Sequence, residues 1–464
     1  MTTVASFGER HFGAASLGHR RRTQCLVRIA NQMYRHPGGT LPTKLHEPKD
    51  YKAMDRLMNR PETTHQAVLE PHRQQTLERM RQSKEVVLVL HDTTELDYSG
   101  LRSIADLGPL GGGYNRGLLC HNSLAFDPRR HEVLGLANQI LHRRRPVGRK
   151  EAVKSKRERL DRESRLWIQG VAAVGPPADG CFWVHVADRG ADTFEFLGRP
   201  WGPGEGFVMR SKVNRVIRRG HHDPHGRQDY LHTYLRTLPL QGRREVVVSA
   251  RPGQPQRKAL VAVAFAPVLL WPPHVRRGLY EKRPLPLWGI RVAEITPPKG
   301  VKPLEWFLLT NGKVGTLQDA WQRASWYECR WVIEEYHKAQ KSGCAIEELQ
   351  FTTSAALTPM IALLSVVAVT LLNLREASRR PDAKERAATD VVAAGYVRVL
   401  SAWRYKKIRM DLSIHEFFYA LARLGGHQNR KRDHRPGWLV LWRGWMALQQ
   451  MLDGVEALKS CGQT

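Results

Sequence analysis

Short apolar runs alternate with helical patterns through the middle of the chain. Residues 86–90 (VVLVL) are apolar and rich in β-branched side chains, which is typical of a strand buried on both faces. We expect this strand to end at His91 and Asp92. Similar runs predict strands at 119–126, 132–141, 181–187 and 206–212. Their alternation with helical segments predicts an α/β fold.

Other patterns flank and interrupt this region. Residues 213–305 are richer in proline and in period-two alternation, which predicts a small antiparallel β insertion. We therefore expect a helical N-terminal domain (1–84), an α/β domain (85–378) that contains the insertion, and a helical C-terminal domain (379–464). The periodicity predicts helices near 17–34, 48–59, 64–83, 316–341, 359–379, 383–404, 412–424 and 438–459.

One apolar run could be mistaken for a membrane span. Residues 360–372 are almost wholly apolar, but about 20 residues are needed to cross a bilayer. Thr358 and Pro359 fit the N-cap and first position of a buried helix. The first 13 residues lack the apolar core of a signal peptide, and no two of the six cysteines form a C-x-x-C pair. We expect a cytoplasmic protein in a reducing compartment.

The charge adds the first functional indication. The 464 residues include 73 Lys and Arg against 44 Asp and Glu, so the formal net charge is 73 − 44 = +29. Nine of the 18 residues in 142–159 are Lys or Arg. Such an excess favours a nucleic-acid partner over a merely basic protein. Arg20, Arg21 and Arg22 oppose the macrodipole at a predicted helix start, so they are candidate phosphate contacts, although a solvated cluster fits equally well.

Three acids lie where they could meet. Asp92 and Asp188 each follow a predicted strand, and Glu334 lies in the predicted helix 316–341. Carboxylates at the ends of neighbouring strands can converge and offer the hard oxygen ligands that Mg²⁺ prefers. Two such ions can activate a water or a 3′-hydroxyl for attack on a phosphodiester. Each Asp taken singly could also be a turn residue.

The spacing within helix 316–341 selects one of two adjacent acids. We expect Tyr327, Arg330, Glu334 and Lys341 to share one face of this helix over about 21 Å. Glu335 lies about 100° away, so Glu334 is the candidate ligand. The alternative is an ordinary exposed face supported by an Arg–Glu pair. His337 and Lys338 close by are consistent with DNA contacts or with solvated residues.

The pattern Y-x2-R-x3-E-x6-K, filled by these four residues, resembles the YREK signature of the insertion-sequence-four family of bacterial DDE transposases, which includes the transposon-five type. The resemblance extends over essentially the whole chain. Its other segments are Asp92 in DTT, Asp188 in DRGAD, 208–212 (VMRSK), Trp306 in WFLLT, 12–18 followed by Arg20–Arg22, and 436–438 through 452–454.

This resemblance implies a ribonuclease-H-like catalytic core that is interrupted by a β insertion. It also implies cut-and-paste transposition of double-stranded DNA by a homodimer on paired transposon ends, with hairpin formation and resolution. The resemblance implies that Asp92, Asp188 and Glu334 hold two Mg²⁺ ions, which Mn²⁺ can replace. It also implies that Tyr327, Arg330 and Lys341 contact phosphates, that Arg210 and Lys212 contact DNA near the cut, and that Trp306 receives a flipped base. The N-terminal domain, with Arg20, Arg21 and Arg22, would bind the transposon ends, and the C-terminal domain would form the dimer.

Two other functions fit parts of the sequence. A ribonuclease-H-fold nuclease would use the same carboxylates without strand transfer. A DNA-binding inhibitor would use the basic N-terminal domain alone, but unused clustered carboxylates would repel DNA without a metal. For Trp306, an ordinary core tryptophan is the alternative to a base-stacking surface.

Overall fold

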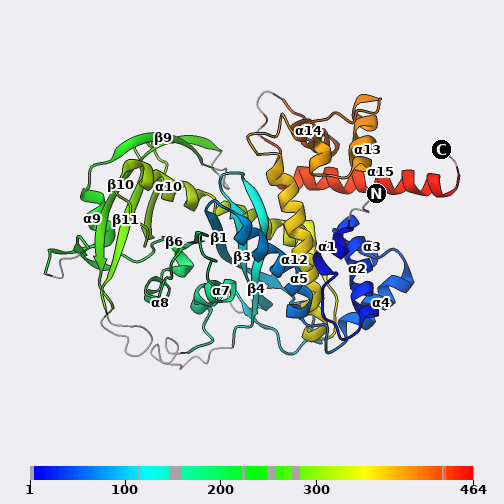
Figure 1. Ribbon diagram of the computed structural model, residues 1–464, viewed down its shortest axis with the longest axis horizontal. Coiled ribbons are helices and arrows are strands. Elements are labelled where there is room, and N and C mark those ends of the chain that lie inside the picture. The colour runs from blue at the N-terminus through cyan, green and yellow to red at the C-terminus, as the bar shows by residue number, and fades with distance from the viewer. Residues whose placement is uncertain are drawn as a thin grey trace.

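A large mixed sheet occupies the centre of the molecule, with helices on its faces and at one end (Figure 1). The computed structural model describes residues 5–111, 114–145, 159–221, 225–248, 256–273, 283–430, 433 and 435–462. Most of the basic stretch 142–159 lies outside these residues. Within the described residues, twelve strands form the sheet in the order β2-β3-β1-β5-β6-β12-β11-β10-β7-β8, with β4 beside β3 and β9 beside β10.

Five strands form the part of the sheet that the apolar runs predicted. They are β1 (Val87–Asp97), β3 (Asn115–Asp127), β4 (Glu132–His142), β5 (Trp183–Ala187) and β6 (Glu205–Arg210). β4, β3 and β1 are antiparallel neighbours, whereas β1, β5 and β6 run parallel. β2 (Gly108–Leu110) extends the β3 side. The mixed α/β prediction is therefore confirmed.

The predicted end of the first strand is wrong. β1 continues past Asp92 to Asp97, because β3 keeps pairing with it as far as Asp97 opposite Gly117. The parallel pairing with β5 stops earlier, at His91 opposite Ala187. Asp92 is thus the first residue of β1 without a neighbour in β5, and from this point the strand changes from buried to partly exposed.

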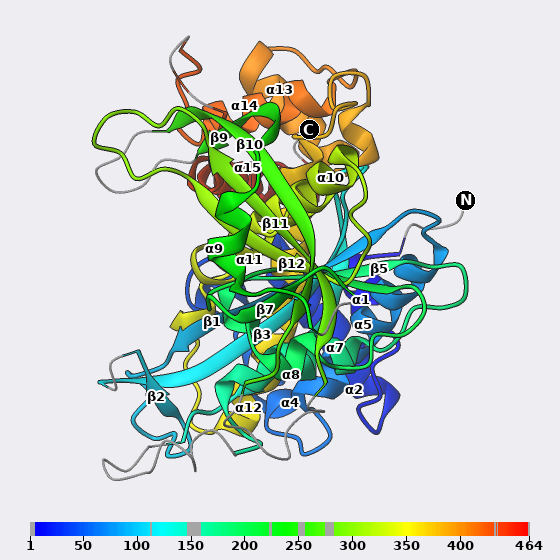
Figure 2. The same ribbon diagram turned by 90° about the vertical axis from the view of Figure 1, so that its left-hand side faces the viewer.

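Antiparallel strands fill the region 213–305, as expected. They are β7 (Val216–Arg219), β8 (Gln228–Tyr230), β9 (Gln241–Val248), β10 (Arg257–Leu270) and β11 (Leu285–Glu294), with α9 (Leu231–Thr237) beside them. β12 (Glu305–Thr310) pairs with β11 on one side and with β6 on the other. The region is therefore continuous with the central sheet and projects from one end of it (Figures 1 and 2).

The N-terminal helices pack onto the opposite end of the sheet (Figure 1). They are α1 (Phe7–Phe12), α2 (Arg20–Arg35), α3 (Leu41–Lys44), α4 (Pro48–Met58) and α5 (His65–Gln82). α5 lies directly on β4, where a Cβ at Gly135 would be 2.1 Å from Thr76 Oγ1 and where φ is +153°. Only glycine allows this approach without a shift.

α12 (Ser354–Ala377) is the long apolar helix that α5, α4 and β4 cover. The helix begins five residues before the predicted start, because the Thr353 hydroxyl accepts a hydrogen bond from the Ala356 amide and acts as the N-cap. Pro359 thus lies inside the helix rather than at its first position. By length and composition the helix could span a membrane, but 83% of its most apolar window is buried in the protein. That burial is the pattern of a soluble protein's core helix.

The C-terminal part of the described chain contains α13 (Ala394–Tyr405), α14 (Ile414–Leu424) and α15 (Trp438–Ser460). The prediction of one helix over 383–404 is wrong at its start. Ala388 donates its amide to Leu412 O and Ile414 donates to Arg386 O, so this segment pairs with the start of α14 instead. The tryptophans of α15 are buried within the chain, whereas Val455 and Leu458 in its last turns are exposed.

Candidate active site

Asp92, Asp188 and Arg210 lie beside one another, each at the same level of three neighbouring parallel strands. His91 in β1 stands opposite Ala187 in β5, and Ala187 stands opposite Met209 in β6. Asp92, Asp188 and Arg210 are the next residues along these three parallel strands. Since neighbouring strands are about 4.8 Å apart, the sheet brings the three together. The expected meeting of Asp92 and Asp188 therefore follows from the strand register.

Arg330 joins the third acid to the first. Its Nη1 lies 3.4 Å from Asp92 Oδ2, and its Nη2 donates to Glu334 Oε1 at 2.7 Å. Arg330 is 7% exposed, so the guanidinium is held between the two carboxylates with little water around it. Because α11 (Trp331–Lys338) contacts β1, Glu334 approaches the same face of the sheet as Asp92.

The prediction of one regular helix over 316–341 is wrong. The segment consists of α10 (Leu317–Glu328), α11 and a π-helical turn (Ala339–Gly343). Between α10 and α11 the Ile333 amide bonds to Arg330 O, three residues back, whereas at the π turn the Cys344 amide bonds to Ala339 O, five residues back. The helix is thus tighter than α at one point and looser at another, so the regular 3.6-residue phasing does not hold from Tyr327 to Lys341.

Lys341 lies apart from the three candidate metal ligands. Its Nζ is 3.0 Å from Glu347 Oε1, and that oxygen also accepts the Asp97 amide. Asp97 ends β1, five residues beyond Asp92, which corresponds to about 17 Å of strand. Arg330 and Glu334 are therefore brought to Asp92, whereas Lys341 is placed further along β1.

Asp92 is the electrostatically strained member of the group. Burial and the nearby Asp188 carboxylate raise the pKa of Asp92, Arg330 opposes the shift, and the net result is a pKa of about 7. Burial alone would lower the pKa of Arg330, but Tyr327, Glu334 and Asp92 raise it above its usual value. The site thus gathers more negative charge than one guanidinium neutralises.

The neighbouring acid Glu335 has a different environment. Its carboxylate is 2.8 Å from Lys338 Nζ and 3.2 Å from Arg375 Nη2. Arg375 also pairs with the buried Glu376 of α12. Glu335 is therefore occupied in fastening α11 to α12, which leaves Glu334 as the acid that faces Asp92, as its helical phase indicated.

The three acids are of the ligand type that Mg²⁺ prefers. Asp92, Asp188 and Glu334 offer hard oxygen ligands, and their mutual repulsion at Asp92 would be relieved by a cation. Among the residues that the structure describes, however, no three His, Cys, Asp or Glu side chains converge closely enough to hold a metal ion. Arg330 lies between Asp92 and Glu334 instead, so a bound metal would require this guanidinium to withdraw.

Tyr327 and Trp306 pack against each other beside this group. Their rings meet edge to face with centroids 5.4 Å apart, and they are only 3% and 7% exposed. Burial lowers the pKa of Arg210, and the adjacent Tyr327 hydroxyl offsets part of that shift. Trp306 thus lies near the expected place, but its face is covered by protein.

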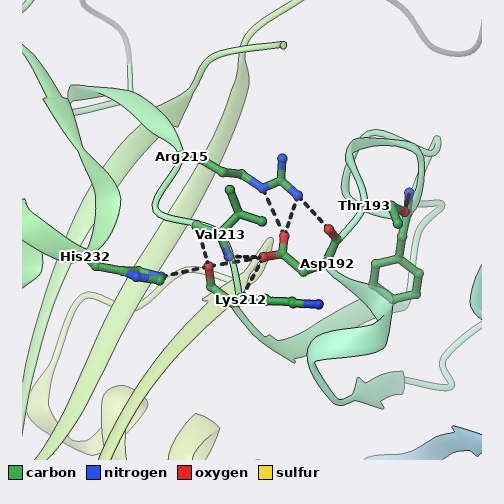
Figure 3. A network of polar contacts seen from close by, with 8 residues as sticks. Asp192, Thr193, Lys212, Val213, Arg215 and His232 are labelled. Carbon is green, nitrogen blue, oxygen red and sulfur yellow. Dashed lines mark hydrogen bonds and ion pairs between the residues drawn. The ribbon is translucent and has the colours of Figure 1, made fainter. Parts of the chain in front are cut away.

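Lys212 belongs to a turn that a buried aspartate organises (Figure 3). Asp192 Oδ2 accepts the amides of Lys212 and Val213 at 2.6 and 2.8 Å, while Oδ1 accepts two hydrogen bonds from Arg215. The Lys212 side chain is exposed. Asp192 is therefore a structural residue that presents Lys212 just after Arg210. The sequence analysis missed it, although it ends the DRGAD segment.

The three N-terminal arginines have different environments. Arg22 is 2.7 Å from Glu62 and donates to Leu17 O, so it helps to hold the N-terminal helices together. Arg20 and Arg21 are exposed in the first turn of α2. Of the three, these two show no side-chain contact to the residues that the structure describes, so they are the better placed to reach a phosphate backbone.

His337 is partly buried, and its ring makes an internal contact that neither sequence interpretation anticipated. Its Nε2 lies 3.2 Å from Asn122 Nδ2, between α11 and β3. The sequence analysis also missed Asn122, because the polar residues at 121–123 within this β run form no recognisable motif. Lys338 is exposed and pairs with Glu335.

No family model matches this chain.

Proposed function

We propose that the chain is a cut-and-paste DNA transposase of the DDE type, with a ribonuclease-H-like core. The observation that carries the proposal is the group formed by Asp92, Asp188 and Glu334. Two of these acids follow the paired parts of two neighbouring parallel strands, and the third is joined to Asp92 through Arg330. The strand order β4-β3-β1-β5-β6, antiparallel then parallel, is consistent with a ribonuclease-H-like core.

Asp92, Asp188 and Glu334 would hold two Mg²⁺ ions, and Mn²⁺ would substitute. Bound Mg²⁺ would activate the attacking water or 3′-hydroxyl and stabilise the leaving oxygen of the phosphodiester. Arg330 would then exchange its carboxylate partners for a phosphate of the DNA. Arg210 at the end of β6 and the exposed Lys212 would contact the backbone near the cut.

The substrate would be double-stranded DNA that carries the transposon ends, followed by target DNA. The net charge of +29 supports a polyanionic partner. Arg20 and Arg21 would contribute to end binding from α2. Tyr327 and Lys341 would contact phosphates of the non-transferred strand. We further propose a homodimer on paired ends, through the C-terminal helices, and a cytoplasmic, nucleoid-associated location in a bacterial cell.

A nuclease without strand transfer is the second candidate, and one observation favours it. Hairpin closure requires a base to leave the stack, yet Trp306 is 7% exposed and covered by Tyr327. In the transposase, the two rings would have to separate for Trp306 to receive a base.

The test uses purified protein, a duplex with the native element end and flanking DNA, and Mg²⁺. A denaturing gel separates nicked, hairpin and joined products. The transposase predicts a hairpin on the element end and joined product with a supercoiled target. Nicks without either product would select the nuclease, and binding without nicking would select a DNA-binding inhibitor.

A further inference from the structure

Asn122 lies directly across the β1–β3 ladder from Asp92. Residues opposite each other on neighbouring strands point to the same face of the sheet, so the Asn122 amide accompanies the Asp92 carboxylate. Asn122 is completely buried, which makes an unpaired amide there costly. Its two polar atoms are both satisfied by side chains from other elements.

One of these partners is His337, which lies one helical turn after Glu334. Asn122 Nδ2 is 3.2 Å from His337 Nε2. Burial lowers the pKa of His337 to about 3, so the imidazole is neutral and its Nε2 can accept a hydrogen bond from the amide. The contact therefore links β3 to α11 at the same level as the Asp92–Arg330–Glu334 bridge.

The other partner extends the chain of hydrogen bonds away from the site. Gln139 Nε2 of β4 donates to Asn122 Oδ1 at 2.8 Å and also lies 2.9 Å from Ser365 Oγ of α12. Gln139 Oε1 lies 2.9 Å from His65 Nε2, at the start of α5. Donors and acceptors alternate consistently from His65 through Gln139 and Asn122 to His337.

We propose that Asn122 and His337 are positioning residues that fix α11 against the sheet and so set Glu334 relative to Asp92. Arg330 alone cannot do this when DNA and metal are bound, because the proposed function requires it to leave the carboxylates. The Asn122–His337 bond does not involve Arg330, and it ties α11 to β3, the strand that pairs with β1 at Asp92. The inference rests on the proposed function, in which Asp92 and Glu334 share a metal.

The test measures Mn²⁺ affinity by the electron paramagnetic resonance signal of free Mn²⁺, and hydrogen exchange of the amides in 331–338. Asn122→Ala and His337→Ala should each weaken Mn²⁺ binding about tenfold, as outer-shell substitutions commonly do, and speed exchange in α11. His337→Gln, which keeps a polar atom near the Nε2 position, should remain within about threefold of wild type. A purely structural role would not distinguish His337→Gln from His337→Ala in Mn²⁺ affinity at equal folding stability.

Asn31→Ala is the matched control. Asn31 also bonds through its side chain, to the Gly8 amide and the Ser6 hydroxyl, but it lies in α2 away from the carboxylates. This variant should bind Mn²⁺ like wild type. If wild-type protein binds Mn²⁺ and Asn122→Ala binds it equally well, the positioning role is overturned but the proposed function is not. If wild-type protein shows no Mn²⁺ binding that depends on Asp92, the proposed function itself is overturned.

Discussion

The guanidinium of Arg330 lies 3.4 Å from the Asp92 carboxylate and also bonds to Glu334, so one cation serves two acids of the group. This arrangement makes Arg330 the internal counter-ion of the metal-free protein. A guanidinium in this place and a divalent cation would compete for the same carboxylates.

The competition predicts the behaviour of Arg330→Gln. Without metal the variant should melt at a lower temperature than wild type, because the carboxylates lose their buried partner. Its melting temperature should rise more than that of wild type when Mn²⁺ is added, since no guanidinium has to be displaced. Differential scanning calorimetry with EDTA and with Mn²⁺ checks both effects. An equal Mn²⁺ shift in the two proteins would contradict the competition.

The raised pKa of Asp92 predicts a pH dependence of stability in EDTA. The pKa is about 7 in the folded protein and about 4 in an unfolded chain, so the folded state holds the proton more firmly. Stability should therefore fall as pH rises from 4 to 7, by up to about 4 kcal/mol. Asp92→Asn should remove this fall, as urea unfolding at pH 5 and pH 8 would show. A variant with the wild-type pH dependence would contradict the assignment.

Lys44 predicts a pH dependence of the opposite sign. Its buried Nζ donates to Pro37 O and, at 2.9 Å, to Cys344 O, just after the π turn that carries Lys341. Burial lowers the pKa of Lys44 to about 8. The unfolded chain then binds more protons between pH 8 and 10.5, so the Lys44 contribution to stability should rise over this range, by up to about 3 kcal/mol. The stability difference between wild type and Lys44→Met, measured by urea unfolding at pH 8 and 10, should change in that direction; a constant difference would contradict it.

The exposure of the N-terminal arginines predicts which of them bind DNA. Arg20→Ala and Arg21→Ala should weaken end binding and reduce the slope of log affinity against log salt by about 0.9 per lost phosphate contact. Arg22→Ala should mainly lower the melting temperature, because Arg22 pairs with Glu62. Fluorescence anisotropy across a salt series separates the two effects. A slope that changes only with Arg22→Ala would reverse the assignment.

Some of this architecture could be predicted because it follows from local pattern. Residues 87–90 of the apolar run are buried in β1, and Asp92 and Asp188 lie at the same level because β1 and β5 are parallel. The phase of Glu334 against Glu335 could be predicted over one helical turn. The phase of Lys341 relative to Tyr327, fourteen residues earlier, could not be predicted, because the turns at Arg330 and at Ala339–Gly343 depart from the regular helix in opposite directions.

Tertiary contacts decided the remaining features. The start of α12 depends on the cap at Thr353, and the segment before α13 is drawn into pairing near Leu412. The roles of Asn122 and His337 depend on a meeting of β3 with α11, more than 200 residues apart in sequence. No local pattern contains that information.

The most direct measurement compares Glu334→Gln with Glu335→Gln, two isosteric changes at adjacent positions of α11. Each variant is incubated with labelled element-end DNA and Mg²⁺, and cleavage and DNA binding are both measured. The account predicts that Glu334→Gln binds DNA but does not cleave it. Glu335 pairs with Lys338 within α11 and with Arg375 of α12, so Glu335→Gln should cleave within about tenfold of wild type. Cleavage retained in Glu334→Gln would contradict the proposed active site.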